Sequence, residues 1–233
     1  MKVAIMQPYF FPYLGYFQLI SAVDKFIIYD DVNYINRGWI NRNNILINGK
    51  ANLINVPLSN ASQNKLIKDT FVVDDIKWKK KLIKTVEQSY LKAPYFENTI
   101  LILKQTLNEG VNNISSLNHL SIKLICNYLE IETEIINSST RYNNCEIRGQ
   151  DRIINICKKE NATHYINPIG GLSMYENNKF ISHNLILSFL QPHLVPYKQY
   201  KNEFVPGLSI IDSLMFCSKS EIRDTLLQQY ELL

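Results

Sequence analysis

The class of fold is indicated by "KVAIMQPYFFPYLGYFQLISAVDKFIIYDDV", residues 2–32. Residues 2–6 and most of residues 25–32 are apolar, and residues 14–23 between them carry apolar side chains at helical spacing. Strands that are apolar on both faces are typical of parallel sheets covered by helices. The stretch therefore predicts a strand, a loop, a short helix and a second strand parallel to the first.

The loop in this stretch, residues 7–17, is dense in aromatic rings and prolines. Proline interrupts helices and strands alike, and so many rings do not all fit into a core. Ligands of parallel sheets bind beyond the carboxyl ends of the strands, where this loop begins. We therefore expect its rings to form part of a ligand surface, with Gln7 orienting a polar substrate and Tyr13 stacking on it.

The second strand runs into "YDDVNYINRGWINRNN", residues 29–44, which carries the densest chemistry in the chain. Two arginines offer bidentate donors to phosphate, paired aspartates can bind a metal or a ribose hydroxyl or take a proton, and a tryptophan can stack on a ring. Taken singly, each residue is more often a turn, a cap or a surface ion pair. As a group they favour a site, whose candidates are Asp30, Asp31, Tyr34, Arg37, Trp39, Asn41 and Arg42.

A second group of candidates follows the predicted strand "THYIN", in residues 163–175. Gly170 and Gly171 come directly after it, where paired glycines allow a backbone to approach an anionic group. The pair lacks the spacing of a phosphate-binding loop, and Gly-Gly is most often only a tight turn. Tyr165 and Tyr175 flank the glycines and offer hydroxyls to a polar substrate.

The remaining patterns complete a mostly parallel, Rossmann-like α/β sheet with flanking helices. Asn48-Gly49 predicts a type I′ turn, and hence an inserted β-hairpin near residues 43–58. Apolar residues at helical spacing predict a helical segment near residues 75–130. Ser209 is expected to cap a helix with Asp212 in its first turn, in a structural role. No linker rich in proline, glycine or serine divides the chain, so we expect a single domain over residues 1–233.

Composition narrows the function. The chain has 233 residues, 46% of them hydrophobic, yet no apolar run of the ~20 residues that cross a bilayer, and no secretory signal. The net charge of +4 is mild, and the lysines of residues 77–84 suit the solvated face of a helix better than a nucleic-acid surface. Four scattered cysteines and four histidines show no metal-ligand spacing, and His119 is expected to be a core or boundary residue. We expect a cytoplasmic protein that binds no nucleic acid, metal or cofactor.

The segments "MKVAIMQPYFFPYLGYFQLI", "FIIYDDV", "GWINRNNI" and "FVPGLSIIDSL" resemble the WbqC-like family of bacterial O-antigen and nucleotide-sugar gene clusters. The resemblance implies a cytoplasmic enzyme that helps to make a sugar of a surface polysaccharide. Family members often carry a histidine where this chain has Gln18, so no catalytic role is assigned there.

Three functions are compatible with these features. The first is a transferase that moves an acyl or aminoacyl group from an activated donor to the amine of a nucleotide-linked sugar, which requires positioning, an oxyanion donor and a base but no metal. Here Asp30 or Asp31 is the expected base, Arg37 and Arg42 bind phosphate, and Trp39 stacks on the substrate. The second is a non-catalytic sugar-nucleotide-binding or partner module of the same pathway.

The third is a divergent nucleotidylyltransferase-like enzyme, because the opening of the chain also resembles that class. Tyr16 stands where that class has its essential histidine, and a neutral phenol cannot supply the imidazolium charge that stabilises phosphate. Adenylyl transfer is therefore disfavoured. The oligomeric state is left open by the sequence.

Overall fold

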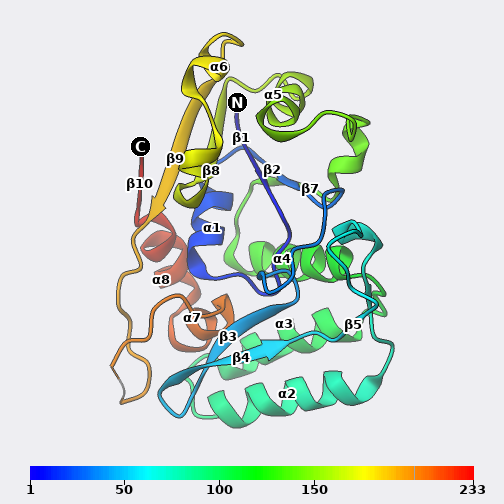
Figure 1. The fold of residues 1–233 in the computed structure, drawn as a ribbon. Coiled ribbons are helices and arrows are strands. Elements are labelled where there is room, and N and C mark those ends of the chain that lie inside the picture. The colour runs from blue at the N-terminus through cyan, green and yellow to red at the C-terminus, as the bar shows by residue number, and fades with distance from the viewer. Residues whose placement is uncertain (202) are drawn as a thin grey trace.

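A six-stranded sheet forms the centre of the computed structural model, which describes residues 1–201 and 203–233 (Figure 1). Its strand order is β10-β9-β8-β1-β2-β7, and every neighbouring pair is parallel except β9 and β10. The strands are β1 (Lys2–Met6), β2 (Lys25–Ile28), β7 (Glu134–Ile136), β8 (His164–Pro168), β9 (Ile186–Pro192) and β10 (Tyr230–Leu232). The predicted mostly parallel α/β sheet is confirmed.

Helices cover both faces of this sheet. Ala4 packs in one core cluster with helices α1, α4, α7 and α8, whereas Val3 and Ile5 pack in a second cluster against α5 and α6. Side chains alternate between the faces because successive residues of a strand point in opposite directions. The helices are α1 (Leu14–Ser21), α4 (Ile114–Leu129), α5 (Gly149–Lys159), α6 (Asn177–Ile181), α7 (Ile210–Phe216) and α8 (Lys219–Asp224). None of the described helices is long and apolar enough to cross a membrane.

Beyond the carboxyl ends of the strands lies a layer made of the inserted hairpin and two helices (Figure 1). The hairpin consists of β3 (Arg42–Ile47) and β4 (Lys50–Asn55), and the helices are α2 (Ile76–Tyr90) and α3 (Phe96–Asn108). Asn48 and Gly49 have φ angles of 52° and 75°, as a type I′ turn requires. The predicted hairpin and helical segment are therefore confirmed. Short elements complete the chain: β5 (Leu58–Ser59), β6 (Phe71–Val72), η1 (Ile67–Asp69), η2 (Ser139–Tyr142), η3 (Ile169–Met174) and η4 (Leu226–Gln228).

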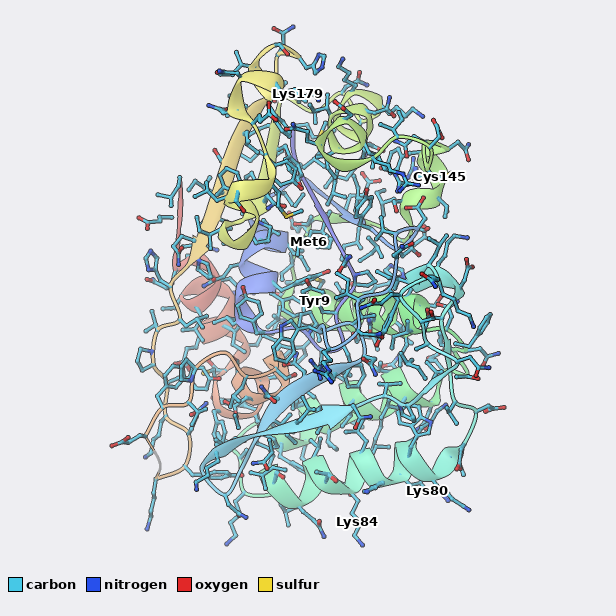
Figure 2. The ribbon with its side chains drawn as sticks, in the orientation of Figure 1. Met6, Tyr9, Lys80, Lys84, Cys145 and Lys179 are labelled. Carbon is cyan, nitrogen blue, oxygen red and sulfur yellow. The ribbon has the colours of Figure 1, made fainter. Side chains whose placement is uncertain are left out.

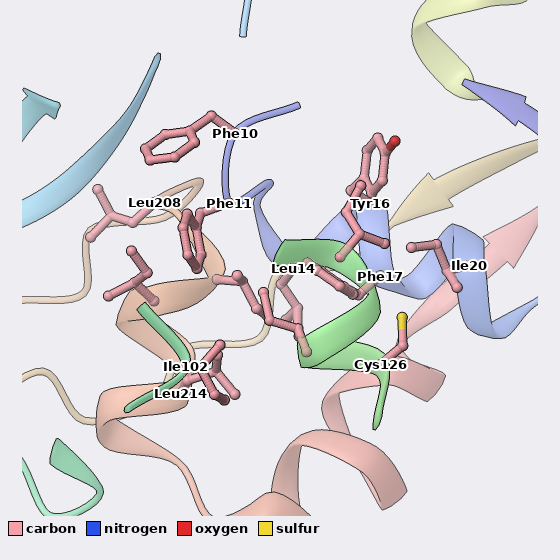
Figure 3. Packing of buried hydrophobic residues seen from close by; sticks show 14 of the residues in the cluster. Phe10, Phe11, Leu14, Tyr16, Phe17, Ile20, Ile102, Cys126, Leu208 and Leu214 are labelled. Atoms are coloured by element: carbon pink, nitrogen blue, oxygen red, sulfur yellow. The ribbon is translucent and has the colours of Figure 1, made fainter. Parts of the chain in front are cut away.

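Most rings of the first loop lie in the core, which corrects the expectation of a ligand surface for these rings but not for the partly buried Tyr9 and Tyr13. Phe10, Phe11, Tyr16 and Phe17 are buried and pack among residues of α1, α3, α4 and α7 (Figure 3). The side-chain amide of Asn43 donates to the carbonyls of Phe10 and Phe11, at 3.1 and 2.7 Å. These bonds satisfy carbonyl groups of a buried, irregular backbone. The inserted hairpin and its two helices supply space for rings that the sheet and its covering helices alone would not accommodate.

Asp212 is buried inside α7, as a structural residue would be. Ser209 caps this helix, accepting a hydrogen bond from the backbone of Ile211. The carboxylate of Asp212 accepts hydrogen bonds from Tyr90 Oη at 2.9 Å, Tyr197 Oη at 2.7 Å and Gln199 Nε2 at 2.6 Å. Burial raises the pKa of Asp212, and these three donors only partly oppose the rise.

Replacing Asp212 with asparagine should change how stability depends on pH. Because the folded-state pKa of Asp212 lies above its ordinary value of 3.8, the folded protein holds this proton over a pH range where the unfolded chain has lost it. This group therefore lowers the free energy of unfolding as pH rises through that range. Asparagine does not titrate, so the stability of Asp212→Asn minus that of the wild type, measured by urea titration, should increase as the pH rises above 3.8. A difference that stays level over this range of pH would contradict this assignment.

Candidate functional site

A cleft opens at the carboxyl ends of β1 and β8, where the topology of the sheet reverses. From β1 the chain passes to β2 and β7 on one side, and then returns to β8 on the other side of β1. Ligands of open parallel sheets bind at this kind of switch point. The cavity there has a volume of about 400 Å³, and we call it the switch-point cleft. It is lined by Ile5, Met6, Gln7, Tyr9, Tyr29, Ile35, Ile153, Asn167, Pro168, Gly170, Gly171, Met174 and Tyr175.

One wall of the cleft comes from the ends of β1 and β2 and the loops that follow them. Gln7 and Tyr9 belong to the first loop, and Tyr29 and Ile35 to the second. The Tyr16 hydroxyl donates to the Gln7 carbonyl at 2.9 Å and fixes the start of the first loop. Figure 2 shows Tyr9 below Met6, between the sheet and the insertion layer. Both predicted loops thus contribute side chains to one cavity.

The opposite wall comes from the end of β8. The Tyr165 hydroxyl donates to Asn167 Oδ1 at 2.9 Å and lies 3.2 Å from the Tyr175 hydroxyl, so one network fixes this wall. Tyr165 itself is fully buried and lies behind the cleft. Gly170 and Gly171 open the 3₁₀ helix η3 and form the surface between Asn167 and Tyr175.

The two glycines differ in how closely their neighbours approach. A Cβ at Gly171 would collide with the side-chain amide of Asn167, whereas a Cβ at Gly170 would have no atom within 4 Å. Gly171→Ala should therefore displace Asn167 and cost about 1–3 kcal/mol of stability, the usual range for overpacking. Gly170→Ala is the matched control and should leave the melting temperature near that of the wild type. If thermal denaturation shows equal losses of stability in the two variants, the close contact of Asn167 with Gly171 does not set the cost of the substitution.

The lining of the cleft is electrically neutral. None of its described lining residues is an aspartate, glutamate, histidine, lysine or arginine. Burial raises the pKa of Tyr9, Tyr29 and Tyr175, so their phenols keep their protons at neutral pH. The cleft therefore offers hydroxyl and amide groups over an apolar surface, which suits an uncharged ligand rich in hydroxyls.

Asp30 and Asp31, the predicted catalytic pair, are buried next to the cleft and have partners. Asp30 accepts hydrogen bonds from Ser138 Oγ at 2.7 Å and Ser115 Oγ at 2.8 Å. Asp31 forms an ion pair with Arg152 at 2.5 Å. Neither aspartate lines the cleft. Their arrangement is that of structural carboxylates, and their catalytic role stays a prediction.

The other residues predicted in the second loop form a cluster of their own. The guanidinium of Arg42 donates to the carbonyls of Gly38 and Arg37 and lies 5.9 Å from the ring of Trp39. The Tyr34 hydroxyl donates to Asn41 at 2.8 Å. None of these five predicted residues, Tyr34, Arg37, Trp39, Asn41 and Arg42, lines the cleft.

This cluster is nevertheless joined to the first loop, because the backbone N–H of Phe10 donates to the Trp39 carbonyl at 3.0 Å. Tyr13, the remaining predicted residue, lines a separate small pocket with Tyr197 and Phe204. The structure thus brings together Gln7, Gly170, Gly171 and Tyr175, with Tyr165 behind them.

Sequence reasoning missed Tyr9, Tyr29, Asn167 and Arg152. Tyr29 and Asn167 lie at the carboxyl ends of their strands. This position is the one feature of the sequence that could have identified them as site residues. Arg152 is 3% exposed, with its guanidinium 5.0 Å from the ring of Tyr29. Arg152 lies within the apolar stripe of α5, and this position could have predicted that its side chain is buried.

Comparison with known proteins adds a family. The sequence model of the WbqC-like protein family matches residues 7–224 of the chain. The uncharacterized protein Rv1507c of Mycobacterium tuberculosis is 33% identical over 228 residues, which cover 97% of each chain. No solved structure matches the chain.

Proposed function

The chain belongs to the WbqC-like protein family, and on that premise we propose that it is a transferase of bacterial surface-polysaccharide biosynthesis that holds a nucleotide-linked sugar in the switch-point cleft. The observation that carries this proposal is the neutral, hydroxyl-lined and partly aromatic surface of the cleft at the switch point. Sugars present hydroxyls at their edges and apolar C–H groups on their faces. Tyrosines match both, since each combines an apolar ring with a polar tip.

The phosphates of such a ligand are expected to lie outside the cleft. A diphosphate needs cationic partners, and none of the described lining residues is a lysine or an arginine. Ile35 lines the cleft, and the exposed Arg37 follows it two residues later. Arg42 and Trp39 lie beside Arg37. We therefore place the sugar ring against Tyr9 and Tyr175, and the phosphates and nucleobase over the Arg37, Trp39 and Arg42 cluster.

The proposed reaction is acyl or aminoacyl transfer to the amine of the bound sugar. The amine nitrogen forms a bond to the carbonyl carbon of an activated donor, the bond from that carbon to the leaving group breaks, and the amine gives one proton to a base. The protonated phenols of the cleft are suitable donors to the tetrahedral oxyanion. Neither aspartate lines the cleft, and of the two Asp30 is the better candidate for the base, because hydroxyls hold its carboxylate whereas Asp31 is paired with Arg152.

A non-catalytic sugar-nucleotide-binding module is the second candidate, and one observation favours it. Both aspartates are buried and hydrogen-bonded, and no carboxylate or histidine is among the lining residues that the structure describes. Incubation of the protein with nucleotide-linked amino sugars and acyl donors, read by mass spectrometry, separates the two functions. An acylated sugar supports the transferase, and binding without any mass change across the donor panel supports the module.

Tyr175→Phe should weaken binding of a nucleotide-linked amino sugar. Loss of one neutral hydrogen bond costs about 0.5–1.5 kcal/mol, or roughly a 2- to 10-fold rise in Kd. Tyr230→Phe is the control, because Tyr230 begins β10 at the edge of the sheet and does not line the cleft. Isothermal titration calorimetry measures both variants. An unchanged Kd in Tyr175→Phe, or an equal rise in Tyr230→Phe, would remove Tyr175 from the site.

A further inference from the structure

A second cavity of about 400 Å³ lies along β7, the edge strand of the sheet, and shares no lining residue with the switch-point cleft. We call it the β7 groove. One wall is α4, where His119, Lys123 and Asn127 are spaced four residues apart and therefore lie on one face of the helix. The other wall follows β7 and carries Asn137 and Arg141. Polar groups from two separate elements thus face the same space.

The β7 groove is positively charged, because Lys123 and Arg141 line it and none of its described lining residues is a carboxylate. Lys123 and Arg141 are exposed, and in the described part of the chain neither forms an ion pair. Glu160, the carboxylate whose pKa the charge of Arg141 helps to lower, does not line the groove and is itself paired with Lys25 at 2.6 Å. Two cations thus line one groove without a carboxylate of their own, an arrangement that an anion would stabilise.

The uncharged groups of the groove add hydrogen bonds and apolar surface. Burial, and then the charge of Lys123, lower the pKa of His119, while Asp30 opposes this shift. At neutral pH His119 therefore offers a neutral imidazole. Ile131 and Ile135 contribute apolar side chains to the lining, which suits an organic group attached to the anion.

We propose that the β7 groove binds a small organic phosphate, with the phosphate held between Arg141 and Lys123 and the organic part against Ile131 and Ile135. Arginine presents a planar fork to two phosphate oxygens, and lysine adds a point charge. The asparagine amides of the two walls supply further donors. This inference does not rest on the proposed function, because the two cavities have different linings and either can fail its test alone.

Adenosine 5′-monophosphate is the probe, titrated by calorimetry into the full-length protein. We expect saturable binding that inorganic phosphate displaces, and roughly a 10-fold rise in Kd for Arg141→Gln and for Lys123→Gln, as expected for loss of a bond to a charged group. Both side chains are exposed, so thermal denaturation should show both variants folded as the wild type. Lys80→Gln is the matched control, an exposed lysine of α2 that points away from the body of the protein (Figure 2).

Three results would overturn the proposal. The first is the absence of saturable binding at millimolar probe. The second is a Kd that Arg141→Gln and Lys123→Gln leave unchanged. The third is an equal rise in Kd for Lys80→Gln, because that would show attraction to the overall charge rather than to the groove.

Discussion

Replacing Asp31 with alanine is expected to lower the free energy of unfolding by about 3–5 kcal/mol, because it leaves the guanidinium of Arg152 buried without its partner. The side chains of Arg152 and Asp31 are only 3% and 5% exposed, and their charged atoms lie 2.5 Å apart. Urea denaturation, followed by circular dichroism, measures the loss.

Two further variants make this test specific. The double variant Asp31→Ala, Arg152→Met removes both charges and should recover part of the loss, since an apolar pair avoids the unpaired buried charge. Asp151→Ala breaks the exposed ion pair with Lys179 and should cost at most about 1 kcal/mol. If Asp31→Ala lowered the free energy of unfolding no more than Asp151→Ala, the ion pair of Asp31 and Arg152 would contribute no more than an exposed pair. That result would contradict its structural role.

Phe10→Ala is expected to cost about 3–5 kcal/mol, the range for truncating a buried aromatic residue. Phe10 is completely buried, and its ring packs against that of Phe11 with centroids 5.0 Å apart and planes at 88° (Figure 3). Truncation therefore removes both the apolar burial and an edge-to-face contact. The free energy of unfolding in urea measures the effect.

The neighbouring residue provides the matched control. Tyr9 is only partly buried and lines the switch-point cleft. Tyr9→Ala should therefore destabilise the protein less than Phe10→Ala but weaken binding of a nucleotide-linked sugar more. Calorimetry and denaturation of both variants separate the two roles. Similar stability losses in both, with binding intact in Tyr9→Ala, would place Tyr9 in the core rather than in the site.

The sequence predicted those parts of the fold whose signals are local. The strand, loop, helix and strand of residues 2–32 follow from two short apolar runs and one helical repeat, and the hairpin follows from Asn48-Gly49. Strands β9 and β10 were not predicted. β10 has only three residues, too few to show a period, whereas β9 contains a short apolar run that cannot be told from a buried helical segment by its period alone. Their pairing depends on partners elsewhere in the chain.

The position of the candidate site could be predicted from the sequence, but not all of its residues could. Ligands of parallel sheets bind where the strands end, and this rule predicted Gln7, Gly170 and Gly171 as site residues. All three line the cleft. The surroundings of Asp30 and Asp31 could not be predicted, because Ser138 and Arg152 lie more than a hundred residues away in the sequence. Burial of a charged residue depends on such long-range partners, which no local pattern reveals.

The proposed function requires the switch-point cleft to hold the sugar of a nucleotide-linked sugar. The decisive test is a crystal structure of the protein soaked with a nucleotide-linked amino sugar. We predict that the sugar ring lies between Tyr9 and Gly170, within hydrogen-bond distance of Tyr175, with its diphosphate beside Arg37. A ligand bound in any other cavity while the cleft holds only solvent would contradict the claim.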